Sequence, residues 1–289
     1  MVEVVQPVTP QGSDRASDPP RELLLRLASA LVLGGATLAL TWSGLWPFAL
    51  LVAAVTLVVA WEWGRVVRGG DFDQVYWASA AALVAAVALA AAGWPRLALC
   101  VLLAGAASIA LVEHRRDGNW AALGVVYVGL AALSLIWLRS GREHGLEAII
   151  FLMLIVWGAD SGAFVFGRSI GGPKLWAPIS PNKTWAGLAG ALVVAGFAAW
   201  AFTVGVTGGD APRSVAVGAL LALISQCGDL IESAIKRRHG VKDASGLIPG
   251  HGGFMDRVDG LIFAAVAAAI YALAIDSGAP AAALLSLKQ

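Results

Sequence analysis

The sequence is poor in charged residues, and this shortage already indicates its class. Only 13% of its 289 residues are Asp, Glu, Lys or Arg, about half of the roughly 25% usual in soluble domains. In contrast, 58% are hydrophobic and the mean hydropathy is +0.76. So few charged residues cannot cover the surface of a water-soluble protein of this size. The high hydrophobic content also excludes a disordered chain. A polytopic membrane protein is expected.

Other features are equally scarce. The two cysteines, Cys100 and Cys227, lie in apolar runs without metal-ligand spacing, so packing roles are expected and a disulfide scaffold is excluded. The net charge of +1 gives no indication of nucleic-acid binding. We find neither the internal repeats of many transporters nor a Walker phosphate-binding loop. Residues 1–21 lack the pattern of a signal peptide and are predicted to be a disordered cytoplasmic tail.

Long apolar runs predict about nine membrane spans. A helix of about 20 residues crosses the hydrocarbon core of a bilayer. The runs of that length lie at 23–42, 46–64, 75–93, 95–112, 120–138, 146–167, 186–207, 213–235 and 258–276. The expected fold is therefore all-α, a polytopic integral membrane helical bundle. About five spans fall in the N-terminal region 22–145, and the others fall in the C-terminal region 146–289.

Basic residues predict the orientation of the bundle. With the N-terminus in the cytoplasm, 15 of the 20 Lys and Arg residues fall on the inner side. The positive-inside rule therefore predicts an N-in, C-out topology. The two long polar loops, 167–185 and 236–257, then face the cytoplasm. We expect a multi-pass protein of the inner (plasma) membrane.

Carboxyl groups inside the C-terminal spans give the first indication of a site. Asp160, Asp229 and Glu232 lie within predicted spans and Asp259 begins the last one, whereas the first half has only Glu62 in such a position. Each central charge costs at least about 2.5–3.5 kcal/mol to insert. A structural salt bridge would explain one of these residues. The whole set predicts a hydrated cavity with a metal ion or cationic partners.

Spacing places the polar residues on shared helix faces. Positions i, i+3, i+4 and i+7 lie on one side of a helix, and here they are Asp229, Glu232, Ser233 and Lys236. Asp256 and Asp259 are three residues apart at the start of the last span. Because Mg²⁺ prefers oxygen ligands, we expect Asp229, Asp256 and Asp259 to bind it. Asp160 is an alternative first ligand, and the number of cations, one or two, stays open.

The two polar loops supply positive charge beside these carboxylates. The basic residues between the last two spans are Lys236, Arg237, Arg238, His239, Lys242, His251 and Arg257. Carboxylates for metal together with cations for phosphate oxygens are typical of phosphoryl or nucleotidyl transfer. Anionic lipid headgroups are an alternative partner for the cations, but they do not explain the carboxylates. In the other loop Ser180, Lys183 and Thr184 precede a span, whose N-terminus favours anions.

Three segments of the C-terminal half have a mixed polar and apolar pattern typical of one enzyme family. The segments are Asp160–Arg168, Ser180–Gly187 and Ser233–Asp259, the last of which contains KDASGLIPGHGGFMDRVD. They resemble the phosphatidate cytidylyltransferases, also called CDP-diacylglycerol synthases. The second segment departs mildly from that pattern at Asn182 and Ala186. The resemblance covers about residues 150–270.

The resemblance implies a nucleotidyltransferase of phospholipid biosynthesis that depends on Mg²⁺. It would convert CTP and phosphatidic acid into CDP-diacylglycerol and pyrophosphate at the cytoplasmic membrane interface. The expected catalytic residues are Asp229, Asp256, Lys183 and Lys236. The expected substrate-binding residues are Asp160, Arg168, Ser180, Thr184, Ser233, Arg237, Lys242, His251 and Arg257. The expected partners are CTP, phosphatidic acid and the lipid bilayer, with no nucleic acid, and we expect a homodimer.

Other classes of protein would share some of these features. A CTP-dependent polyprenol kinase or an archaeal-type lipid cytidylyltransferase would use similar residues. Release of pyrophosphate rather than CDP separates cytidylyl from phosphoryl transfer. A CDP-alcohol phosphatidyltransferase is disfavoured, because its Asp-Gly motif with two further spaced aspartates is not found. A cation-coupled transporter would bury Asp160 and Asp229 but does not require the Lys236–Asp259 loop, and a structural scaffold explains none of the buried charge.

Overall fold

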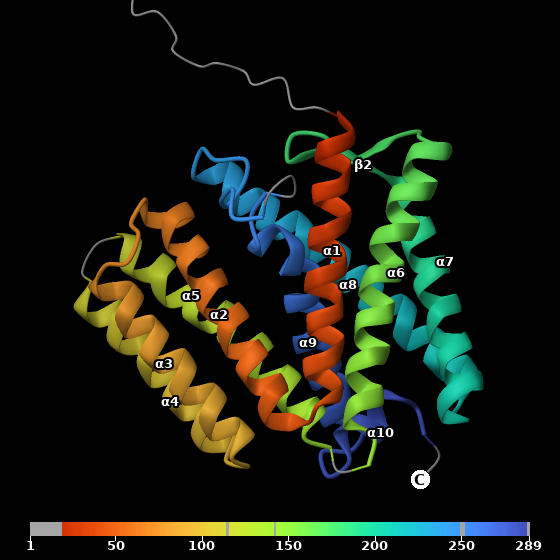
Figure 1. The fold of residues 1–289 in the computed structure, drawn as a ribbon, viewed down its shortest axis with the longest axis horizontal. Helices are drawn as coiled ribbons and strands as arrows, with labels where there is room; N and C mark the ends of the chain where they lie inside the picture. Colours follow the sequence, from red (N-terminus) through yellow and green to blue (C-terminus); the bar gives the residue numbers. More distant parts are fainter. Residues whose placement is uncertain (1–18, 114–115, 142, 249–251, 288–289) are drawn as a thin grey trace, which may run out of the picture.

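The protein is a bundle of long helices in the computed structural model, which describes residues 19–113, 116–141, 143–248 and 252–287 (Figure 1). In chain order its elements are α1 (Pro19–Trp42), α2 (Leu45–Arg68), α3 (Gln74–Ala91), α4 (Pro95–Val112), α5 (Arg116–Arg139), α6 (Gly145–Ser169), β1 (Lys174–Trp176), β2 (Ser180–Thr184), α7 (Trp185–Phe202), the π-helical turn η1 (Thr203–Thr207), α8 (Ala211–Arg238), α9 (Met255–Ile275) and α10 (Pro280–Leu284). The expected helical architecture is confirmed.

Most of the predicted spans are present as long apolar helices. In the described part of the chain, eight helices, α2 to α9, are long and apolar enough to cross a membrane. The predicted span 23–42 falls on α1, whose described apolar part is Leu31–Trp42. Residues 1–18 of the predicted tail lie outside the described residues, and α1 begins at Pro19. The polytopic bundle expected from composition is therefore correct.

The two polar loops are shorter than predicted. α8 continues to Arg238 and α9 begins at Met255, so Lys236 and Asp256 lie in helices rather than in a loop. Straight-chain basic residues form helices well and are favoured at a helix C-terminus, which is why this polar stretch stays helical. In the other loop β1 and β2 pair antiparallel, with Lys174 opposite Thr184.

The helices form two groups that meet at α9. Figure 1 shows α2 to α5 on one side of the bundle and α6 and α7 on the other, and α9 contacts α2, α5, α6 and α8. The β1–β2 hairpin and the α8–α9 connection lie at the same end, and α10 lies at the opposite end. The chain thus brings its two polar loops to the same end of the bundle.

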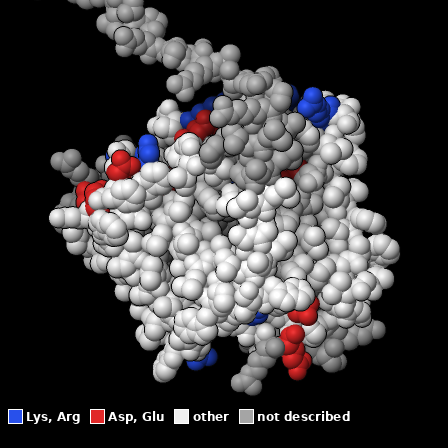
Figure 2. Space-filling view, in the orientation of Figure 1, with Lys and Arg blue, Asp and Glu red and all other residues white. Residues whose placement is uncertain are grey.

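The surface of the bundle suits a lipid environment. In the face that Figure 2 shows, charged side chains lie towards the two ends and the broad band between them carries almost none. Large apolar side chains such as Leu50, Phe197 and Ile270 are exposed. Lipid tails can cover such a band, whereas a soluble monomer rarely exposes so much contiguous apolar surface.

Small residues let the helices approach closely, as is common in membranes. A Cβ atom added at Gly162 of α6 would lie 2.6 Å from the carbonyl oxygen of Gly190 on α7. Likewise, Gly228 beside Asp229 leaves room for the ring of Phe263 from α9. These contacts fix α6 against α7 and α8 against α9, close to Asp160 and Asp229.

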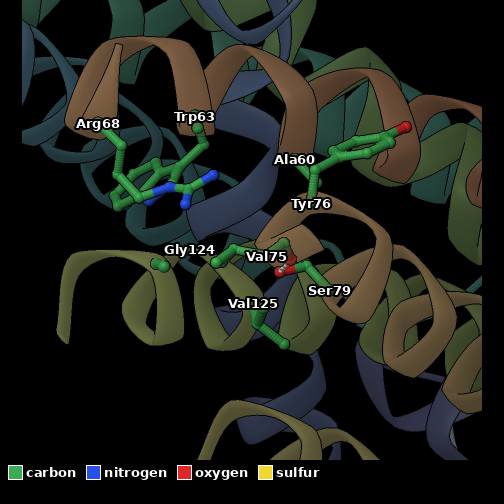
Figure 3. Close-up of a pocket in the computed structure, with 10 residues that line it drawn as sticks. Ala60, Trp63, Arg68, Val75, Tyr76, Ser79, Gly124 and Val125 are labelled. Atoms are coloured by element: carbon green, nitrogen blue, oxygen red, sulfur yellow. Dashed lines mark hydrogen bonds between the residues drawn. The ribbon is translucent and has the colours of Figure 1, made fainter. Parts of the chain in front are cut away.

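The N-terminal helices are packed tightly as well. A cavity of about 20 Å³ lies between α2, α3 and α5. Trp63, Arg68 and Tyr76 are among its lining residues (Figure 3). A Cβ atom at Gly124 would lie 2.4 Å from the indole of Trp63. The space holds about one water molecule, so it is too small to be a substrate site.

Candidate active site

A cavity of about 340 Å³ collects side chains from α6, the hairpin, α7, α8 and α9. Its acidic residues are Asp160, Asp229, Asp256 and Asp259, and its basic residues are Lys183 and Arg257. We call it the carboxylate cavity. Sequence reasoning expected all six of these residues in the site, and the structure brings them together from segments up to about 100 residues apart. Their convergence depends on the close packing of α6 to α9.

A connected set of polar contacts crosses this cavity. The Nζ atom of Lys183 lies 2.6 Å from Oδ2 of Asp229 and 3.4 Å from the carbonyl oxygen of Gln226. The amide of Gln226 donates a hydrogen bond to Oδ1 of Asp160 at 3.0 Å. Ser233 Oγ lies 3.4 Å from Oδ1 of Asp229, one turn along α8. The network therefore joins α6, β2 and α8 through charged groups and the neutral side chains of Gln226 and Ser233.

Gln226 was missed as a site residue by sequence reasoning. It lies three residues before Asp229, so it faces the same side of α8. A buried amide within an apolar span was a signal that could have found it.

Asp256 is held firmly at the start of α9. Its Oδ1 atom forms an ion pair with Lys236, whose Nζ also lies 2.8 Å from Oε2 of Glu232. Its Oδ2 atom accepts hydrogen bonds from the backbone N–H groups of Ala244 (3.3 Å) and Gly253 (3.0 Å). Both oxygens of Asp256 thus have protein partners, and Lys236 bridges two acids from different helices.

The predicted metal ligands line one cavity without forming a closed metal site. In the described residues, no three His, Cys, Asp or Glu side chains are close enough together to hold a metal ion. Lysines already pair with Asp229 and Asp256. Asp259 forms no ion pair with a described residue and accepts a hydrogen bond from Gly260 N–H at 2.7 Å. The carboxylate oxygens suit Mg²⁺ chemically, and the assignment of ligands stays a prediction.

A second cavity, of about 210 Å³, adjoins the first. Its polar residues include Ser180, Asn182, Ser233, Lys236, Arg237 and Lys242. We call it the basic cavity. Asn182 lines both cavities and so marks where they meet. Five of these six residues were expected in the site; Asn182 was noted only as a departure from the family pattern.

The remaining predicted residues have different positions. Thr184 lines the carboxylate cavity and also caps α7, because its Oγ1 accepts a hydrogen bond from Gly187 N–H at 3.0 Å. Arg168 lines neither cavity. It is exposed at the end of α6, with its guanidinium 5.9 Å from the ring centroid of Phe164 at the cavity rim. His251 lies outside the described residues.

A membrane-embedded bundle with adjoining acidic and basic cavities defines an integral membrane enzyme that acts on phosphate groups. A family model described as "Cytidylyltransferase family" matches residues 24–275. The chain therefore belongs to the cytidylyltransferase family. The match includes the N-terminal helices, whereas sequence reasoning traced the resemblance only over about residues 150–270.

Relatives of known name support the family assignment over most of the chain. The phosphatidate cytidylyltransferase of Brucella suis is 40% identical over 248 residues, which cover 84% of this chain and 90% of that protein. That of Pseudomonas aeruginosa is 35% identical over 252 residues, covering 81% and 90% respectively. The Bacillus subtilis protein of the same name is 39% identical over 143 residues, about half of each chain.

Proposed function

We propose that this chain transfers the cytidylyl group of CTP to phosphatidic acid, producing CDP-diacylglycerol and pyrophosphate. The observation that carries the proposal is the meeting of the carboxylate cavity and the basic cavity at Asn182. Two substrates with phosphate groups need two adjoining sites, one for each. The relatives named phosphatidate cytidylyltransferase support this choice of substrates.

The basic cavity is the proposed site for the triphosphate of CTP. Lys236, Arg237 and Lys242 place three cationic side chains around it, and Ser180 and Ser233 add hydroxyl groups. Charge-assisted hydrogen bonds from such groups to phosphate oxygens are stronger than neutral ones. Because the hairpin residues that line this cavity lie at one end of the bundle, the nucleotide can enter from that end.

The carboxylate cavity is the proposed site for the phosphatidate headgroup. Phe164 and Leu188 contribute to its wall, and the side chain of Phe164 is 65% exposed on the apolar surface of α6. A lipid can thus keep its acyl chains in the bilayer while its phosphate enters the cavity. Lys183 and Arg257 supply the positive charge that this phosphate requires.

In the proposed reaction an oxygen of the phosphatidate phosphate attacks the α-phosphorus of CTP. A new P–O bond forms as the bond from the α-phosphorus to the oxygen that bridges to the β-phosphate breaks, and pyrophosphate leaves with that electron pair. Lys183, Lys236 and Arg237 stabilise the charge spread over the transferred group. The attacking phosphate is largely ionised near neutral pH, since its second pKa is about 6, so no strong general base is needed.

Mg²⁺ is the proposed cofactor, held by Asp229, Asp256 and Asp259, with Asp160 as the alternative ligand. Mg²⁺ bound there would supply positive charge to the reacting phosphate groups and to the leaving pyrophosphate where the two cavities meet. Lys183 and Lys236 already pair with Asp229 and Asp256, so these lysines keep both carboxylates oriented within the cavity. His251 is proposed to help position the substrates.

The proposed topology is N-in and C-out in the inner membrane, with both cavities facing the cytoplasm, where CTP is found. The hairpin and the α8–α9 connection lie at one end of the bundle, which supports a single active face. A homodimer stays a prediction.

The function is tested with purified protein in detergent, supplied with CTP, phosphatidate and Mg²⁺. We expect a CDP-lipid and pyrophosphate in equal amounts, and we expect EDTA to abolish both. The Asp229→Asn variant serves as the inactive control. Release of CDP in place of pyrophosphate would indicate phosphoryl transfer and overturn the proposal.

A further inference from the structure

Glu62 of α2 is a fully buried carboxylate in the half of the chain that contributes nothing to the lining of either cavity. Its exposed fraction is 0%. Oε1 accepts hydrogen bonds from Ser245 Oγ and, at 2.8 Å, from the backbone N–H of Phe254. Oε2 accepts one from the backbone N–H of Met255. The donors are Ser245, near the middle of the α8–α9 connection, Phe254, its last residue, and Met255, the first residue of α9.

These contacts supply a cap that α9 lacks in its own sequence. The first N–H groups of a helix have no partner within the helix, and a carboxylate close to them is stabilised by the helix dipole. The residue before α9 is Phe254, which offers no capping side chain. Glu62 therefore caps α9 from another helix, about 190 residues away in the sequence.

Gly253 lies between the carboxylates of Glu62 and Asp256. A Cβ atom there would be 2.8 Å from Oδ2 of Asp256 and 3.0 Å from Oε1 of Glu62. Asp256 in turn accepts hydrogen bonds from the N–H groups of Gly253 and Ala244, next to Ser245. Both carboxylates thus accept hydrogen bonds from the segment around Gly253, and Asp256 belongs to the carboxylate cavity.

We infer that Glu62 is a positioning residue for the active site: it fixes the first turn of α9, and thereby Asp256, Arg257 and Asp259, relative to α8. The inference rests on the proposed function. It also assigns a role to the N-terminal helices, because α2 then helps to shape a cavity to which it contributes no lining side chain. The alternative is that Glu62 stabilises the bundle as a whole without any particular effect on the site.

The test compares Glu62→Gln with Glu113→Gln, which makes the same change at the end of α4, away from both cavities. The amide keeps the shape of Glu62 but loses its charge and half of its accepting capacity. We expect hydrogen–deuterium exchange to be faster across residues 252–260 in Glu62→Gln and unchanged there in Glu113→Gln. We also expect kcat to fall about 10- to 100-fold, with KM for CTP within about twofold, because the basic cavity keeps its lining residues.

Hydrogen–deuterium exchange and kinetics test the positioning role of Glu62 separately from the proposed cytidylyl transfer. Faster exchange with an unchanged kcat, or unchanged exchange, would overturn the positioning role. If wild-type protein forms no CDP-lipid, the proposed function fails, while the exchange experiment still decides whether Glu62 caps α9. If Glu62→Gln does not fold, Ser245→Ala takes its place, since it removes only the hydroxyl contact. In Ser245→Ala, a smaller increase in exchange together with a smaller fall in kcat supports the positioning role. Exchange and kcat equal to those of the wild type overturn it.

Discussion

Lys183 on β2 and Asp229 on α8 form an ion pair, with Nζ and Oδ2 2.6 Å apart. The hairpin is thereby attached to α8, which lines both cavities. Lys183 lies next to Asn182, the residue at which the cavities meet. A cation at this point can contact phosphate groups of both substrates, which is why we place it at the centre of the site.

Replacing Lys183 by Met should remove this charge while keeping most of the side-chain volume. We expect kcat/KM for cytidylyl transfer to fall about 100-fold, as when a preorganised charge-stabilising group is removed. The matched control is Lys174→Met, at an exposed position on β1 that lines neither cavity. Equal losses in the two variants would show that Lys183 has no specific role.

Gln226→Leu should impair the reaction without changing the charge of the site. The substitution removes the hydrogen bond to Asp160 and leaves that carboxylate without its amide donor. Losing such a bond costs about 1–3 kcal/mol, so we expect a rate roughly tenfold lower. Steady-state assays with varied phosphatidate measure the effect. A wild-type rate would mean that the network through Gln226 does not orient Asp160.

The close approach of α6 and α7 can be tested through stability. In Gly162→Ala the new methyl group would lie 2.6 Å from the Gly190 carbonyl oxygen, so the helices must separate. Overpacking of this kind destabilises a protein by about 1–3 kcal/mol. We expect a lower Tm in detergent. Gly205→Ala is the control, because nothing lies within 4 Å of a Cβ atom there, and its Tm should match that of the wild type.

Asp73, which precedes α3, should make stability depend on pH. Its Oδ1 accepts a hydrogen bond from Tyr76 N–H, and Oδ2 lies 2.8 Å from Arg68 Nη2. Partial burial raises its pKa, but the hydrogen bond from Arg68 and the one from Tyr76 N–H outweigh burial and hold the pKa below the ordinary value of 3.8. The stabilisation is therefore complete above the unfolded-state pKa and is lost as pH falls through the folded-state pKa.

The measurement compares the wild type with Asp73→Asn, which still caps α3 but cannot carry the negative charge. We expect the wild type to have the higher Tm at pH 7. The difference should shrink as pH falls below about 4, where the carboxyl begins to protonate. A difference that stays constant over this range would contradict the role of the ion pair with Arg68.

Much of the architecture could be predicted because apolar runs of span length have few other interpretations in a chain with so little charge. The stripe on α8 was also predictable, since Asp229 and Ser233 are one turn apart and helical periodicity places them on one face. The convergence of Asp229 and Asp256 followed from the need to pair buried charge.

Contacts between segments that are distant in the sequence could not be predicted from periodicity or composition. Glu62 was visible as an isolated acid in an apolar span, but its donors at Phe254 and Met255 depend on how α2 packs against α9. Asn182 carries no charge, so its presence in the site follows only from the fold. Gln226 could have been noticed in the sequence as an amide within an apolar span, but its hydrogen bond to Asp160 depends on the packing of α6 against α8. Arg168 was expected in the site on account of its charge, yet it lines neither cavity and packs on Phe164.

The most direct measurement follows the position of the label in the product. Purified protein is given phosphatidate and Mg²⁺ with CTP labelled with ³²P at either the α- or the γ-phosphate. We predict that the α-label enters the lipid extract and that the γ-label stays in the aqueous phase as pyrophosphate. Transfer of the γ-label to lipid, with none of the α-label, would contradict cytidylyl transfer at this site.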